Sequence, residues 1–173
     1  MRILGIDPGI GICGFGLIEM TSRAGAKAHD FGAVTTKVDV PMSERLLELY
    51  ESLTQVFKET KPEVVAIEKL FFSKNITTGI AVAEARGVIL LVAEQYGAKV
   101  REYTPNEIKK SLTGYGSATK TQMEEMVRVH LGLETKPKPD DAADALAAAI
   151  TCSFLYREDE VIQVDKFSNS RRK

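Results

Sequence analysis

The chain has 173 residues, of which 44% are hydrophobic and 27% charged, and its formal net charge is −1. These values are typical of one ordinary globular domain, and no apolar stretch approaches the roughly 20 residues that a membrane-spanning helix needs. The first residues enter a strand pattern without the layout of a signal peptide, so we expect a cytoplasmic protein with no membrane partner. We also expect Cys13 and Cys152 to be buried free thiols rather than a disulfide.

The first 35 residues predict an antiparallel meander of three strands. Residues 3–6 are apolar, and Asp7-Pro8-Gly9 has the composition of a turn. Strand character returns over residues 13–18, and a third strand is expected near residues 31–35.

Helices and strands alternate in the rest of the chain. A helix is expected over residues 43–60, with a buried face made of Leu46, Leu47, Tyr50, Leu53 and Phe57. Further helices are expected over about 77–95, from Pro105 behind the capping-box pair Thr104 and Glu107, before Gly132, and over 141–156. Strands are expected over 64–68 and 99–103. This order predicts an α/β domain over residues 1–156, with helices on the faces of a mixed sheet, and a mobile tail over 157–173.

Carboxylates stand at three places where a fold could aim them at one point. Asp7 and Glu68 end two apolar strand runs, and Asp141 and Asp144 open the last helix. Such a cluster binds hard divalent cations and catalyses two-metal hydrolysis of phosphodiesters. Ordinary alternatives are a turn for Asp7, a solvated strand end for Glu68 and a helix cap for Asp141. Asp144 lies on an apolar helix where an unpaired charge is costly, and spacing alone would pair it with either Asp140 or Asp141.

Four segments, in this order and spacing, resemble the RuvC family of bacterial Holliday-junction endonucleases. They are Gly5-Ile6-Asp7-Pro8-Gly9, Ala66-Ile67-Glu68-Lys69-Leu70-Phe71, Ala85-Arg86-Gly87 and Asp141-Ala142-Ala143-Asp144-Ala145-Leu146. The resemblance covers residues 3–151 and implies an RNase H-like fold: a five-stranded mixed sheet, its first three strands antiparallel, flanked by helices. It also implies that Asp7, Glu68, Asp141 and Asp144 are the catalytic acids. Asp140 is then left with a capping or supporting role.

The resemblance further implies a cofactor, a substrate and partners. Two Mg²⁺ ions per subunit, replaceable by Mn²⁺, would support paired symmetric nicks in four-way DNA junctions, leaving 5′-phosphate ends. The enzyme would be a homodimer and would work with the RuvA–RuvB branch-migration complex. From the residues themselves, the helix over 77–95 is the expected interface, because its apolar residues occupy more than one face; burial within the monomer would explain the same pattern. Lys109 and Lys120 match lysines that contact DNA, although solvated surface lysines are the ordinary interpretation. Phe71 matches an aromatic residue that stacks on exposed bases; packing of Phe71 in the core, with Phe72 exposed, is the alternative.

Three other functions are alternatives to junction cleavage. The segment Asp7-Pro8-Gly9-Ile10-Gly11 also resembles the phosphate loop of actin-like ATPases and sugar kinases, but those proteins need two such domains and the chain is too short. A related RNase H-like nuclease acting on structured RNA is the main alternative. A non-catalytic junction-binding protein is disfavoured because all four acids are present.

Overall fold

The computed structural model describes residues 1–22, 25–69 and 76–156. In this part of the chain, five strands form one sheet in the order β3-β2-β1-β4-β5. The strands are β1 Arg2–Asp7, β2 Ile12–Ser22, β3 Gly25–Thr35, β4 Val64–Glu68 and β5 Lys99–Tyr103. β1, β2 and β3 form an antiparallel meander, whereas β4 pairs parallel to β1 and β5 parallel to β4. The mixed sheet that the sequence predicts is therefore confirmed.

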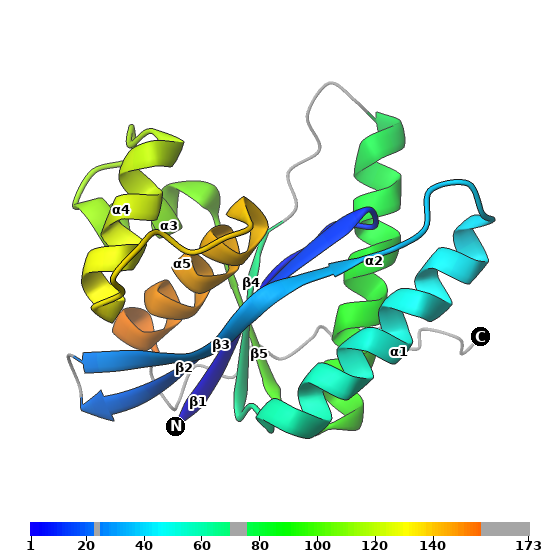
Figure 1. Cartoon of the computed structure of the whole chain (residues 1–173), viewed down its shortest axis with the longest axis horizontal. Helices are drawn as coiled ribbons and strands as arrows, with labels where there is room; N and C mark the ends of the chain where they lie inside the picture. The colour runs from blue at the N-terminus through cyan, green and yellow to red at the C-terminus, as the bar shows by residue number, and fades with distance from the viewer. Residues whose placement is uncertain (23–24, 70–75, 157–173) are drawn as a thin grey trace, which may run out of the picture.

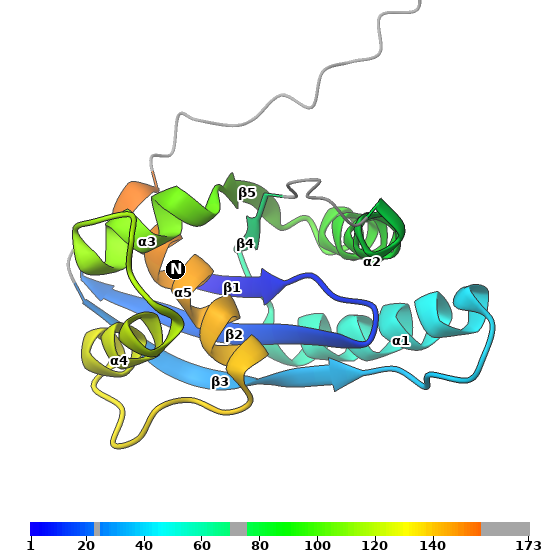
Figure 2. The same ribbon diagram turned by 90° about the horizontal axis from the view of Figure 1, so that it is seen from above.

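Helices cover both faces of the sheet (Figures 1 and 2). They are α1 Met42–Thr60, α2 Ile76–Gln95, α3 Pro105–Thr113, α4 Lys120–Leu131 and α5 Asp140–Leu155. α1 and α2 pack on one face around a core that contains Leu53, Phe57 and Ile89. α3, α4 and α5 pack on the other face, around Leu146 and Ile150. The central strands β1 and β4 thus lie between two apolar layers, as parallel strands in mixed folds usually do.

The strands alternate between these two layers. In β1, Ile3 belongs to the core on the α5 side, whereas Leu4 and Ile6 belong to the core on the α1 side. In β4, Val64 contributes to the first core and Val65 to the second. Because side chains alternate across a strand, this pattern fixes the direction of each residue that follows.

Several local predictions are confirmed and one is wrong. Thr104 and Glu107 form the predicted capping box, and both cysteines are buried and free. Leu47, however, is 55% exposed, and Leu49 takes its place in the core. The buried stripe of α1 runs through Leu49, Leu53 and Phe57 at helical spacing, and Leu47 lies outside it.

Two predicted features lie outside the described residues: Phe71 with its neighbour Phe72, and the tail over 157–173. Among the helices that the structure does describe, none is long and apolar enough to cross a membrane.

Candidate active site

Strand alternation directs the first two acids to the same side of the sheet. Asp7 ends β1 two residues beyond Gly5, on the face that α5 covers. Glu68 ends β4 two residues beyond Ala66, which lies in the core on that same face. Since β1 and β4 are parallel neighbours, their carboxyl ends lie side by side at one edge of the sheet. Asp7 and Glu68 therefore both face the start of α5.

Glycines let α5 approach close enough to bring the other two acids to this edge. A Cβ on Gly5 would overlap the carbonyl oxygen of Ala145, and a Cβ on Gly14 would overlap that of Asp141. Only a residue without a side chain permits such backbone contact. α5 consequently crosses β1 and β2 directly (Figure 2), and Asp141 and Asp144 arrive beside Asp7.

The pKa of the Asp7 carboxyl reflects the closeness of the other three acids. Burial, which is the largest cause, and then the charges of Asp144, Glu68 and Asp141 together raise the pKa of its carboxyl to about 7, while Lys120 opposes the rise. Burial also raises the pKa of Glu68, with Asp144 adding to the effect and Lys109 opposing it. Like charges gathered in a poorly solvated place disfavour ionisation, so the four predicted acids interact with one another.

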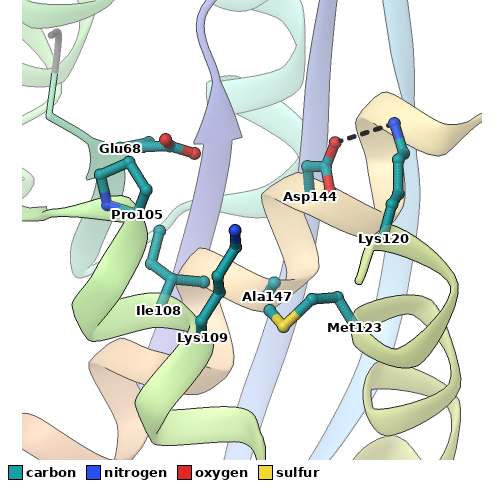
Figure 3. A pocket seen from close by; sticks show the side chains of 8 residues that line it. All are labelled: Glu68, Pro105, Ile108, Lys109, Lys120, Met123, Asp144 and Ala147. Carbon is teal, nitrogen blue, oxygen red and sulfur yellow. Dashed lines mark ion pairs between the residues drawn. The ribbon is translucent and has the colours of Figure 1, made fainter. Parts of the chain in front are cut away.

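Lysine side chains face the acids across a pocket of about 270 Å³ (Figure 3). The pocket is lined by Glu68, Pro105, Ile108, Lys109, Lys120, Met123, Asp144 and Ala147. Lys120 Nζ lies 3.3 Å from a carboxylate oxygen of Asp144 and 3.6 Å from one of Asp140. Burial raises the pKa of Asp144, and Lys120 opposes that rise. The structure therefore places Lys109 and Lys120 beside Glu68 and Asp144.

Of the two roles expected for Asp140, the helix cap is wrong, and the supporting role stays a prediction. The residue before α5 is Pro139, no side chain caps the helix, and Asp140 is its first residue. Asp140 instead pairs with Lys138 at 2.9 Å, which holds the pKa of its carboxyl below the usual range. The ion pairs of Asp140 with Lys138 and Lys120 were missed by sequence reasoning. An Asp next to a helix start signals a cap more often than a surface ion pair.

The donor set fits hard divalent cations, because carboxylate oxygens are the ligands they prefer. A cation would also relieve the mutual repulsion that raises the pKa of Asp7. In the described part of the chain, no group of three or more His, Cys, Asp or Glu side chains lies close enough to hold one metal ion in this conformation. Asp144 is turned toward Lys120 and forms an ion pair with it (Figure 3).

The sheet order and the acids at the ends of neighbouring strands are those of an RNase H-like nuclease. The family model described as "Crossover junction endodeoxyribonuclease RuvC" matches residues 3–152. The chain therefore belongs to the RuvC family of crossover junction endodeoxyribonucleases.

Individual relatives agree with this assignment. A protein of the same name from Caldicellulosiruptor saccharolyticus is 50% identical over 166 residues, which cover 93% of this chain and 100% of the relative. A structure of T. thermophilus RuvC in complex with Holliday junction substrate has a TM-score of 0.81 and 32% identity, over 89% of this chain and 94% of that one. The yeast mitochondrial Holliday junction resolvase Ydc2, at 14% identity and a TM-score of 0.64, covers 88% of this chain and 77% of its own, and shares the fold.

Proposed function

We propose that this protein resolves four-way DNA junctions by paired, symmetric, metal-dependent hydrolysis of phosphodiesters. Asp7, Glu68, Asp141 and Asp144 are the proposed catalytic acids. The observation that carries this proposal is the partly buried Asp7 carboxyl beside the other three acids, whose pKa is raised first by burial and then by their charges. Like charges in a poorly solvated place are costly without a group of opposite charge beside them. A divalent cation is the group that suits four carboxylates.

The proposed cofactor is Mg²⁺, two ions per subunit, which Mn²⁺ can replace. Asp7, Glu68, Asp141 and Asp144 would hold these ions. When bound, such ions lower the pKa of an attacking water and neutralise the charge that develops on the departing oxygen. The products are expected to carry 5′-phosphate and 3′-hydroxyl ends.

Lys109 and Lys120 are proposed to contact the DNA backbone. Both line the pocket beside Glu68 and Asp144, so a phosphate held near the acids lies within their reach. Such contacts position the strand without reading its sequence, and they make binding depend on salt concentration. Lys120 must leave Asp144 for this role, and its side chain is 54% exposed and can turn toward solvent.

The proposal also includes a base-stacking residue, a homodimer and a partner complex. Phe71, outside the described residues, would stack on an exposed base, a contact worth about 1–3 kcal/mol. Two chains would form a homodimer with one active site per strand to be cut, since a two-fold assembly suits a symmetric substrate. The RuvA–RuvB branch-migration complex is the proposed partner.

A single experiment tests the reaction. The protein is incubated with a synthetic four-way junction and with a linear duplex of the same sequence, with and without Mg²⁺. We expect paired nicks at symmetric positions, confined to the junction and dependent on the metal. Cleavage of structured RNA but not of the DNA junction would instead establish the RNA-processing alternative.

The Asp7→Asn variant tests the site. Asn keeps the shape of the side chain but removes the charge that would help to hold the ions, so we expect normal folding and junction binding with no detectable cleavage. Binding is measured by gel shift in Ca²⁺ and folding by circular dichroism. Cleavage at the wild-type rate by this variant would refute the catalytic assignment.

A further inference from the structure

The turn that follows Asp7 is hydrogen-bonded to a residue that comes directly after another strand. Residues 8–11 connect β1 to β2, and Thr36 comes directly after β3. The Thr36 hydroxyl donates to the carbonyl oxygen of Ile10, and its backbone N–H donates to that of Gly11 at 3.1 Å. Thr36 is only 7% exposed, so these hydrogen bonds are shielded from competing water.

A second residue fixes the Thr36 hydroxyl from the other side. Arg45 lies in the first turn of α1, and its Nε donates to Thr36 Oγ1 at 3.1 Å. The same guanidinium lies against the turn, because a Cβ on Gly11 would be 3.6 Å from Arg45 Nη2. The hydroxyl thus accepts from Arg45 while it donates to Ile10, which leaves it one orientation. α1 is in this way connected through Thr36 to the turn beyond Asp7.

The ends of the sheet ladders show why this connection matters. In the register of β1 with β4, the last pair is Ile6 with Ile67. In the register of β1 with β2, the last pair is Asp7 with Gly14. Asp7 is therefore held by the sheet on one side only, and the chain beyond it enters the turn that Thr36 holds. Errors of about 1 Å in the placement of a reacting group can cost a hundredfold in rate.

We propose that Thr36 and Arg45 are positioning residues for Asp7, which fix the turn over residues 8–11 and through it the direction of the catalytic carboxylate. Neither residue touches the substrate or the metal in this role. The inference rests on the proposed catalytic function of Asp7. It adds two residues, one directly after β3 and one in α1, to the residues that align the acids.

The variant Thr36→Val tests the proposal, because it keeps the shape of the side chain and removes the hydroxyl. Thr60→Val is the matched control: Thr60 is 5% exposed and its hydroxyl donates to the Val56 carbonyl at 2.7 Å, at the opposite end of α1. Thr60→Val should lose about 1 kcal/mol of stability for its single hydrogen bond, and Thr36→Val about twice as much, because its hydroxyl makes two. Thr36→Ser retains the hydroxyl and should restore wild-type behaviour.

Three quantities are measured on each variant: the single-turnover cleavage rate at saturating protein and Mg²⁺, the junction Kd in Ca²⁺, and the Mg²⁺ concentration at the midpoint of the metal-induced rise in Tm. For Thr36→Val we expect a rate at least about tenfold lower and a several-fold higher Mg²⁺ midpoint, with an unchanged Kd. Thr60→Val should match the wild type in all three. Arg45→Met should resemble Thr36→Val, and the double variant should be no worse than either single one, because both act through one hydroxyl.

Failure of this inference can be told apart from failure of the proposed function. If Asp7→Asn cleaves normally, the catalytic assignment is wrong. If Asp7→Asn is inactive while Thr36→Val cleaves as fast as Thr60→Val, the positioning role alone is overturned. A Thr36→Ser variant as slow as Thr36→Val would also overturn it, since the hydroxyl would then not be the active feature.

Discussion

Asp7 is a partly buried carboxyl whose ionised form opposes folding while no metal is bound. Burial and three neighbouring carboxylates raise its pKa from 3.8 to about 7. The folded state therefore holds its proton more tightly than the unfolded chain does. The protonated carboxyl therefore contributes to the free energy of unfolding, in full below about pH 4, and this contribution is lost as the pH rises through about 7. The residue proposed to be most important for catalysis thus weakens the metal-free fold at physiological pH.

This cost predicts that Asp7→Asn stabilises the metal-free protein. At pH 8 we expect a gain of about 2–4 kcal/mol, because each pH unit between the two pKa values corresponds to about 1.4 kcal/mol. The gain should shrink toward zero near pH 4, where Asp7 is protonated in both states. The measurement is urea unfolding in EDTA at several pH values.

The control for this prediction is Asp140→Asn. The pKa of Asp140 is lowered, first by its hydrogen bond with Lys138, so removal of that charge should bring no gain at pH 8. A metal-free Asp7→Asn protein less stable than the wild type at pH 8 would show that the carboxylates do not repel one another as the structure indicates.

The identities of the site residues were accessible from sequence to different degrees. Asp7 and Glu68 could be found because each ends a short apolar strand, and Asp144 because it interrupts an apolar helix. Spacing alone did not separate Asp140 from Asp141. The roles of Thr36 and Arg45 could not be found at all, since their hydrogen bonds join segments whose contact is decided only by the tertiary fold.

Among the helices and strands, α5 must pack closely on β1 and β2 to bring Asp141 and Asp144 beside Asp7. Their contact depends on backbone atoms: Gly14 in β2 faces the carbonyl of Asp141, with no room for a methyl group. Sequence periodicity located α5 to within one residue at each end, because its apolar run is long. It predicted β3 only from residue 31, whereas the strand begins at Gly25. The missed part is polar and lies at the sheet edge, where solvent replaces the apolar pattern.

We predict that Gly14→Ala displaces the start of α5. The added methyl group meets helix backbone that cannot rotate away, so we expect a loss of about 1–3 kcal/mol in unfolding free energy. Because Asp141 lies at the point of contact, cleavage should fall at least tenfold under conditions where the variant is fully folded. Denaturant unfolding and single-turnover cleavage of a junction provide the two measurements.

Gly32→Ala serves as the comparison. Gly32 lies in the neighbouring strand β3, and its Cβ would meet only the edge of the Phe15 ring at 3.3 Å, a side chain that can shift. This variant should lose less stability and cleave normally. Equal effects of the two substitutions on cleavage would show that close approach of α5 is not what places Asp141.

In the whole molecule, α2 has an apolar surface that the monomer does not bury. Its inner face, with Ala85, Ile89 and Val92, packs on the sheet, whereas Ile80 and Leu91 on the outer face are more than half exposed. A spacing of eleven residues puts Ile80 and Leu91 on one side of the helix, about three turns apart, and exposed apolar side chains on one side of a helix suit an interaction surface. The proposed homodimer gives this surface a function, because two active sites related by a two-fold axis can cut both strands of a junction in one encounter.

We predict that Leu91→Glu breaks this dimer. Two carboxylates would be brought together at an isologous interface, where a charge without a partner is costly, so the protein should become monomeric in size-exclusion chromatography with light scattering. Cleavage of a supercoiled plasmid that extrudes a cruciform should then yield mainly nicked circles. The wild-type dimer should yield linear product, because it cuts both strands before it dissociates.

Leu47→Glu is the control variant, which separates the effect of a charge at the interface from the effect of a charge at any exposed apolar position. Leu47 on α1 is as exposed as Leu91, at 55% against 54%, but lies on another helix. It should accept the charge and remain a dimer that produces linear plasmid. If Leu91→Glu stayed dimeric, α2 would not be the interface. If it became monomeric and still produced linear product, coupled cutting would not require the dimer, and each chain would have to act on both strands by itself.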